Sequence, residues 1–273
     1  MPDPQARAAE ALLDWWDVCG VDVGDARAAL RAATRARAVS GDSAAAPDAA
    51  SARTRPARKP PQARPGVADA RAAAAASHDL TALRAAIAAF DGCDLKKTAR
   101  NTVFCDGAES ADIMLVGEAP GRDEDEQGKP FVGRSGQLLD KMFAAIGFAR
   151  SSNLFISNVI FWRPPGNREP TPAEVGQCQP FIERAIALKS PKILVFVGGV
   201  AAKAMLGGEA GVMKLRGRKL EYKPREGPSV NAMVMLHPAY LLRRPQEKRL
   251  AWNDLLLLEA WAEDLGVARG QRF

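Results

Sequence analysis

The sequence predicts an α/β fold in three layers: a central, mostly parallel four-stranded sheet with helices on both faces. Two observations support this prediction. The strand-like segments are short, uninterrupted apolar runs, which is typical of strands buried on both faces. Helical patterns follow most of these runs, and parallel strands need such crossover connections. With 273 residues, of which 47% are hydrophobic, the chain can bury a complete core.

Two further regions are predicted before this sheet. Residues 1–36 place Ala, Leu and Trp at helical spacing, and we expect a small helical appendage there. Residues 37–77 are rich in Ala, Pro, Ser and Arg, so burial cannot offset the entropy lost on ordering them. We expect a disordered linker that serves either as a spacer or as a basic arm for phosphates. Residues 78–273 then form the main domain.

The elements of the main domain follow in order along the chain. The strands are predicted at 112–117, 153–160, 192–198 and 231–236. The helices are predicted at 135–147, 171–190, 198–207 and 247–265. Gly147 ends the first of these helices. Thr171, with Glu174 three residues later, forms a capping box that begins the second.

Polar side chains follow three of the predicted strands. Glu118 comes directly after the first, Asn158 lies just inside the end of the second, and His237 follows the last. Taken singly, each has a structural explanation: a surface acid, a strand-end cap, a satisfied polar residue. Ligands of open α/β sheets bind at the carboxyl ends of the strands, where these residues would meet. Because the other histidine, His78, lies at the linker edge, His237 is the main candidate for chemistry near neutral pH.

An aromatic ring and a set of cations surround the same predicted mouth. Phe131 lies in a loop rich in Gly and Pro after the first strand, either as a core anchor or as a stacking platform for a planar ligand. The cations are Arg134, Arg163, Arg168, Arg243, Arg244, Lys248 and Arg249. The whole chain is basic, with 38 Lys and Arg against 32 Asp and Glu, which favours a polyanionic partner.

Four long motifs, in this order, resemble the family 4 uracil-DNA glycosylases within the larger uracil-DNA glycosylase superfamily. They read GEAPGRDEDEQGKPFVGRSGQLLD, SNVIFWRPPGNREPTPAE, LVFVGG and LHPAYLLR, and the resemblance covers about residues 79–262. It implies a DNA repair hydrolase that flips uracil out of single- or double-stranded DNA. The enzyme would hydrolyse the N-glycosidic bond and leave an abasic site, as in base excision repair.

The resemblance also implies a role for each candidate residue. The catalytic residues are Glu118, which stabilises the sugar cation or positions water, and His237, which hydrogen-bonds uracil O2. The uracil-binding residues are Asn158, Phe131, Ala119 and Glu124. Asn158 reads the base edge, and Glu124 shapes the loop. The DNA-binding residues are Leu241, Arg243, Arg134, Arg163 and Arg168. Leu241 would wedge into the space that the base leaves, and Arg243 would hold the backbone.

The family typically holds a [4Fe–4S] cluster through four cysteines. In this sequence Phe90 and Trp162 occupy two of the ligand positions, whereas Cys93 and Cys178 fill the other two. We therefore predict that the protein has no cofactor or metal, and that Phe90 and Trp162 fill the cluster's volume by apolar packing.

Two alternatives remain open at this point. The acidic run Asp123, Glu124, Asp125 and Glu126 could bind the metals of a phosphohydrolase. A non-catalytic or weakly catalytic module could bind uracil-containing or abasic DNA through the same pocket. No apolar run approaches the roughly eighteen residues of a membrane span, and no signal-peptide pattern occurs at the N-terminus. We expect no membrane partner and a cytoplasmic, nucleoid-associated monomer of a bacterial type.

Overall fold

The structure is a computed structural model that describes residues 66–225 and 227–270. A six-stranded sheet forms its centre, in the order β1-β3-β2-β4-β6-β5. The four central strands are parallel: β2 (Ile113–Gly117), β3 (Leu154–Asn158), β4 (Ile193–Val197) and β6 (Val230–Met235). The edge strands are antiparallel to their neighbours: β1 (Cys105–Gly107) and β5 (Leu220–Tyr222).

The sheet therefore has six strands, not the four that the sequence predicted. All four predicted strands are present, and each differs from its predicted range by one or two residues at an end. The two missed strands have three residues each, and none of the residues of β1 is fully buried. Such short edge strands leave no continuous apolar run, so the pattern that identifies central strands does not detect them.

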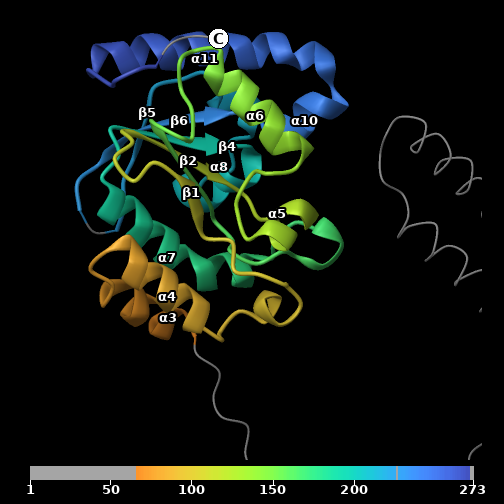
Figure 1. Cartoon of the computed structure of the whole chain (residues 1–273), viewed down its shortest axis with the longest axis vertical. Helices are drawn as coiled ribbons and strands as arrows, with labels where there is room; N and C mark the ends of the chain where they lie inside the picture. Colours follow the sequence, from red (N-terminus) through yellow and green to blue (C-terminus); the bar gives the residue numbers. More distant parts are fainter. Residues whose placement is uncertain (1–65, 226, 271–273) are drawn as a thin grey trace, which may run out of the picture. The chain divides into compact units, whose positions relative to one another are not determined.

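Helices cover both faces of this sheet (Figure 1), which confirms the predicted three-layer α/β fold. On one face lie α6 (Arg134–Ala144) and α11 (Lys248–Asp264). On the other lie α3 (Val67–Ala75), α4 (Leu80–Ala89), α7 (Pro172–Lys189) and α8 (Gly199–Leu206). The strand residues alternate between the two cores. Ile113 and Leu115 pack with the first group, and Met114 and Val116 with the second.

The described residues also contain six shorter helical elements. They are α5 (Arg122–Gln127), α9 (Val212–Leu215), α10 (Pro238–Arg243), and the 3₁₀ turns Asp94–Lys97, Pro165–Asn167 and Pro245–Glu247. The predicted capping box at the start of α7 is present: Glu174 N donates to Thr171 Oγ1 and Thr171 N donates to Glu174 Oε2. A cap of this kind stabilises a helix by about 1 kcal/mol.

Helix α3 lies inside the range 37–77 that the sequence predicted as a disordered linker, so the folded part begins earlier than expected. Ala70 and Ala74 are buried where α3 packs against α7. Alanines allow two helices to approach closely, but they lack the large apolar side chains by which the sequence pattern identifies a core. The predicted appendage at 1–36 and the linker up to residue 65 lie outside the described residues.

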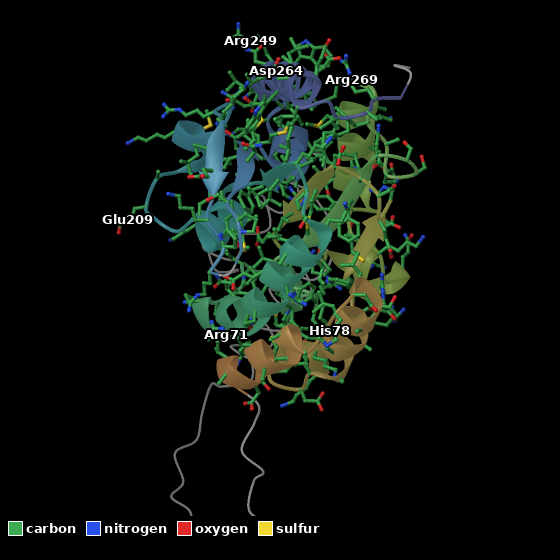
Figure 2. The ribbon with its side chains drawn as sticks, turned by 90° about the vertical axis from the view of Figure 1, so that its left-hand side faces the viewer. Arg71, His78, Glu209, Arg249, Asp264 and Arg269 are labelled. Carbon is green, nitrogen blue, oxygen red and sulfur yellow. The ribbon has the colours of Figure 1, made fainter. Side chains whose placement is uncertain are left out.

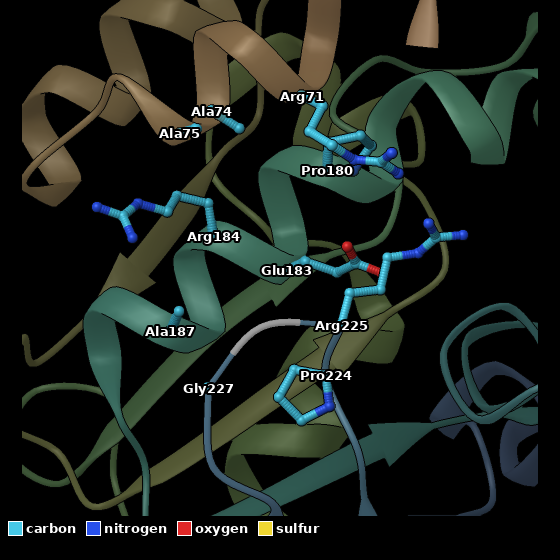
Figure 3. Close-up of a pocket in the computed structure, with 10 residues that line it drawn as sticks. All are labelled: Arg71, Ala74, Ala75, Pro180, Glu183, Arg184, Ala187, Pro224, Arg225 and Gly227. Carbon is cyan, nitrogen blue, oxygen red and sulfur yellow. The ribbon is translucent and has the colours of Figure 1, made fainter. Parts of the chain in front are cut away.

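Two other features lie away from the polar strand ends. A cavity of about 270 Å³ opens between α3, α7 and the segment that joins β5 to β6 (Figure 3). Its charged lining residues are Arg71, Glu183, Arg184 and Arg225, and it contains none of the predicted site residues. His78 is exposed, at the opposite end of the domain from Arg249 and Arg269 (Figure 2). Among the described residues, no helix is both long and apolar enough to cross a membrane.

Candidate active site

The parallel strands bring three sequence-distant segments to one edge of the sheet. Gly117, the last residue of β2, is the register partner of Asn158, the last residue of β3. Glu118 follows Gly117, and its carbonyl accepts from Ile160 N at 3.0 Å. His237 lies two residues beyond the end of β6. The predicted convergence of these strand ends is thus present.

Phe131 and Asn158 both lie against the backbone of Gly117. A Cβ built on Gly117 would clash with Asn158 Oδ1 and would lie 2.6 Å from Phe131 Cε2. The rings of Phe131 and His237 are also neighbours, with centroids 5.6 Å apart and planes tilted by 31°. The structure therefore brings together the ring, the amide and the imidazole, and a glycine at position 117 makes this close approach possible.

Asn158 is the most informative polar residue at this edge. Its side chain is almost completely buried, with 1% of the residue exposed. Its Oδ1 is a buried acceptor without a hydrogen-bond partner among the described residues. Leaving such a group unpaired costs about 1–3 kcal/mol, and native proteins retain few of them. The atom is therefore positioned to accept a hydrogen bond from a ligand.

His237 is held as a neutral imidazole. Its Nδ1 accepts from Ala239 N at 3.1 Å, so that His237 caps α10 and carries its proton on Nε2. Burial, together with the charge of Arg243, lowers the pKa of His237 to about 4. Behind the ring lies Gly198, with φ of 100°, where an added Cβ would be 3.1 Å from His237 Cβ. The site thus presents an uncharged N–H donor.

Glu118 is a half-buried carboxyl at the same edge. Burial, and secondarily the charge of Glu169, raises the pKa of Glu118 above its ordinary value. Ala119 follows it and is also half-buried. A carboxylate in such a position can stabilise a cation or orient water more strongly than an exposed acid, because solvent screens it less.

Glu124 closes the loop that carries Phe131. Its Oε1 accepts from Val132 N and Gly133 N, each at 2.9 Å, and its Oε2 accepts from Gly121 N at 3.1 Å. The neighbouring Asp125 accepts from Arg100 N and Asn101 N. Two of the four acids in the run that could have formed a metal site are therefore engaged with backbone amides.

The predicted DNA-binding residues differ in how the structure engages them. Arg134 and Arg243 are exposed. Arg163 Nε donates to Asn167 Oδ1 at 2.7 Å. Arg168 makes a two-pronged ion pair with Glu174, at 2.9 and 2.7 Å, and so supports the start of α7. The ion pair with Glu174 thus gives Arg168 a structural role at the start of α7.

The position of Leu241 does not fit the wedge role expected of it. Leu241 is 0% exposed and packs with Leu236 and Ala251. The next residue, Leu242, is 38% exposed. In a short helix consecutive side chains point in different directions, so a shift of one position separates a core residue from a surface residue. The expectation for Leu241 rested only on its position four residues after His237, and sequence spacing does not show which of two adjacent leucines is exposed.

Three residues that lie against the site residues were not identified from the sequence: Gly117, Gly198 and Arg150. Each glycine lies at the carboxyl end of a predicted strand, a position that could have been noticed once the strands were aligned. Arg150 donates to the carbonyls of Pro130 and Phe131, and no sequence pattern announces such backbone contacts.

The two cysteines at expected cluster positions lie together in the core. Cys93 and Cys178 are both buried, and the neighbouring Cys178 side chain lowers the pKa of the Cys93 thiol. Phe90 and Trp162 are buried nearby, and Phe90 packs edge-on against Phe181 with centroids 5.2 Å apart. The described residues contain no group of three or more His, Cys, Asp or Glu side chains arranged to hold a metal ion.

Comparison with known proteins identifies the family that this chain matches. Residues 104–256 match the family model of the uracil DNA glycosylase superfamily. The chain is 42% identical over 158 residues to the Type-4 uracil-DNA glycosylase of Archaeoglobus fulgidus, covering 56% of this chain and 78% of that protein. It is 38% identical over 189 residues to the Type-4 uracil-DNA glycosylase of Pyrobaculum aerophilum, covering 66% and 92%. For the Type-4 enzyme of Thermotoga maritima the identity is 35% over 166 residues, covering 60% and 84%.

These relatives correct the prediction that the protein has no cofactor. Type-4 uracil-DNA glycosylases are iron–sulfur enzymes, so the prediction drawn from Phe90 and Trp162 is wrong. Counting cysteines at motif positions could not decide the point, because iron–sulfur clusters also accept ligands other than cysteine. Cys93 and Cys178 offer two thiolate ligands. They do not complete a set of four.

The matched range contains every predicted site residue from Glu118 to Arg243 and all four parallel strands of the sheet. It extends over more than half of the chain. The chain belongs to the uracil DNA glycosylase superfamily.

Proposed function

We propose that the protein excises uracil from DNA by hydrolysing the N-glycosidic bond, which leaves an abasic site. The observation that carries the proposal is the buried, unpaired Oδ1 of Asn158, which lies beside Phe131 at the edge that also holds His237. DNA is the partner of this family, and the basic composition of the chain agrees with it.

Asn158 would select uracil by its hydrogen-bonding edge. Its Oδ1 accepts from uracil N3–H, and its amide nitrogen donates to uracil O4. Cytosine presents an acceptor at N3 and a donor at N4, so both contacts would be wrong. A site that leaves buried polar groups unpaired with the wrong base discriminates strongly against it. Phe131 would stack on the face of the extruded base, a contact worth about 1–3 kcal/mol.

His237 and Glu118 would stabilise the two charges that form as the bond breaks. The base leaves as an anion, and the Nε2–H of the neutral His237 would donate to uracil O2 as its negative charge grows. The sugar becomes cationic, and the carboxylate of Glu118 would stabilise it or orient the attacking water. Because burial raises the pKa of Glu118, this role requires a pH above that raised value.

The uracil must leave the base stack before it reaches these groups, and extrusion costs a few kcal/mol. We propose that Arg243 and Arg134 contact the phosphates beside it, since both are exposed near the site. Either single- or double-stranded DNA would serve as substrate. We also propose that the protein acts as a cytoplasmic monomer at the nucleoid.

The test is release of free uracil from an oligonucleotide that contains one uracil, under multiple turnover. Asn158→Ala and His237→Ala should each lower kcat/KM by about 100-fold or more, because each removes a contact that forms with the departing base. The matched control is Asn153→Ala. Asn153 lies at the other end of β3 and accepts from Ala149 N at 2.7 Å, so its loss should reduce stability and not excision.

Two results would contradict the proposal. If both site variants cut at the wild-type rate, the role assignments are wrong. If the wild-type protein binds uracil-containing DNA but releases no uracil, the chain is the non-catalytic binder.

A further inference from the structure

Phe131 has a backbone conformation that an aromatic residue does not adopt without support. Its φ is 53°, in the left-handed region that L side chains rarely occupy. The residue is nevertheless almost completely buried, with 5% exposed, and its ring lies against Gly117 and His237. Surrounding contacts must therefore hold the peptide groups on both sides of the ring.

Arg150 holds the carbonyl groups of this turn. Its Nη2 donates to Phe131 O at 2.7 Å, and its Nη1 donates to Pro130 O at 3.1 Å. The guanidinium is itself fixed by two acids: Nη1 pairs with Asp106 Oδ2 at 2.9 Å, and Nε and Nη2 donate to Asp140 Oδ1 at 3.0 and 2.9 Å. Only 20% of its side chain is exposed. The two acids alone would neutralise the charge of this guanidinium. The contacts with the two carbonyls are therefore not needed for ion pairing.

The amide side of the same turn is held independently. Glu124 accepts from Val132 N and Gly133 N, the two residues after the ring. Gly136 packs directly against the carbonyl of Phe131, and a Cβ at position 136 would overlap that carbonyl. The guanidinium thus binds the carbonyls of both peptide groups that flank Phe131, and Glu124 binds the N–H of the second of these peptides, so the backbone on both sides of the ring is held.

We propose that Arg150 is a positioning residue for excision: by holding the carbonyls of Pro130 and Phe131 it keeps the Phe131 ring where the extruded base stacks. The inference rests on the proposed function. Lysine cannot replace it fully, because the planar fork of arginine serves two carbonyls and two acids at once, whereas an ammonium is a single point.

The first experiment measures amide hydrogen exchange in the peptide that spans residues 129–136, with no DNA present. Arg150→Met should increase amide exchange there about tenfold or more. Opening the loop in the wild-type protein must break the guanidinium contacts, and in the variant it need not. The control is Arg269→Met, which also removes an arginine that bridges two acids, Glu259 and Glu263, and which has no hydrogen bond to a loop carbonyl within residues 66–225 and 227–270. Arg269→Met should leave exchange in this peptide unchanged.

The second experiment is a double-mutant cycle on kcat for uracil release at saturating oligonucleotide. Arg150→Met should lower kcat about 10–100-fold, because displacing a reacting contact by about 1 Å costs up to about 100-fold. In a Phe131→Ala background the same change should have almost no effect, since Arg150 acts through the ring. Arg269→Met should leave kcat unchanged in both backgrounds.

Equal losses in both backgrounds would overturn the inference, and so would unchanged exchange in the 129–136 peptide, or a Phe131→Ala variant with wild-type kcat. If Arg150→Met does not fold, Arg150→Lys replaces it. Smaller changes in the same directions are then expected, because the ammonium keeps part of the contacts, and unchanged exchange together with unchanged kcat would overturn the inference. If the wild-type protein releases no uracil, the proposed function fails, and the exchange experiment then decides alone whether Arg150 holds the loop.

Discussion

Two buried polar clusters in this protein differ in whether their hydrogen bonds are complete. In the first, Arg216 joins the segment after α9 to α11: its Nε donates to Asp254 Oδ2 at 2.9 Å, and its Nη2 bonds Asp254 Oδ1 and the Leu250 carbonyl. Both oxygens of Asp254 are paired, and its side chain is 1% exposed. In the second, at the carboxyl edge of the sheet, Asn158 is buried to the same degree but its Oδ1 has no partner among the described residues.

The difference separates structure from function. Breaking a completed buried pair by removing one partner costs about 3–5 kcal/mol of unfolding free energy, because the remaining charge is left buried and unpaired. An incomplete one lowers stability and is retained where a ligand completes it. Changes in the Arg216 cluster should therefore affect unfolding, whereas changes around Asn158 should affect excision.

The largest expected effect compares two glycines, one from each cluster. Gly117→Ala should reduce kcat/KM for uracil release by about 10³-fold. The new Cβ would displace both Asn158 and Phe131, and misplacing one group by about 1 Å already costs about 100-fold. Gly217→Ala is the matched change, because its Cβ would meet Asp254 Oδ1 and its φ is 62°. It should cost about 1–3 kcal/mol of unfolding free energy with excision per folded molecule unchanged.

Steady-state kinetics and urea unfolding of the two variants decide the comparison. If Gly217→Ala loses as much kcat per folded molecule as Gly117→Ala, the two clusters are not functionally separate.

A smaller effect concerns pH and His237. Its folded pKa of about 4 lies below the ordinary value, so between about pH 6.5 and 4 the unfolded chain binds a proton that the folded chain does not. Stability should therefore fall as pH falls through this window, by up to about 3 kcal/mol. His237→Gln should remove that part of the dependence, measured by urea unfolding at pH 4.5 and 7.

The low pKa of His237 also predicts how the excision rate depends on pH. Since His237 is already neutral at pH 6, the excision rate should show no inflection from it between pH 6 and 8. A rate that falls with a midpoint near 6.5 as the pH is lowered, and that loses this midpoint in His237→Gln, would show that the imidazole titrates normally.

The sequence predicted the parts of this site that depend on strand ends and not the parts that depend on backbone contacts. Glu118, Asn158 and His237 were identifiable because each follows an apolar run, and parallel strands place such positions at one edge. Glu124 was predicted to shape the loop only through the family resemblance, and Arg150 was not predicted. Its contacts are with carbonyls of a turn that depends on a φ of 53° at Phe131, which no residue pattern specifies. Likewise β1 and β5 were missed, because three-residue edge strands depend on their neighbours and not on their own composition.

The smallest expected effect on excision comes from Leu242, which we compare with Leu241. Leu242 is exposed after His237, so it is the side chain that could enter the gap left by an extruded base. Leu242→Ala should lower excision from duplex DNA about tenfold and change single-strand excision little, because a single strand has less stacking to break. Leu241→Ala should instead cost about 2–5 kcal/mol of unfolding free energy, since it leaves a cavity against Leu236 and Ala251. A duplex-selective loss in Leu241→Ala, with Leu242→Ala unaffected, would mean that α10 turns when it meets DNA and that the buried leucine is the wedge.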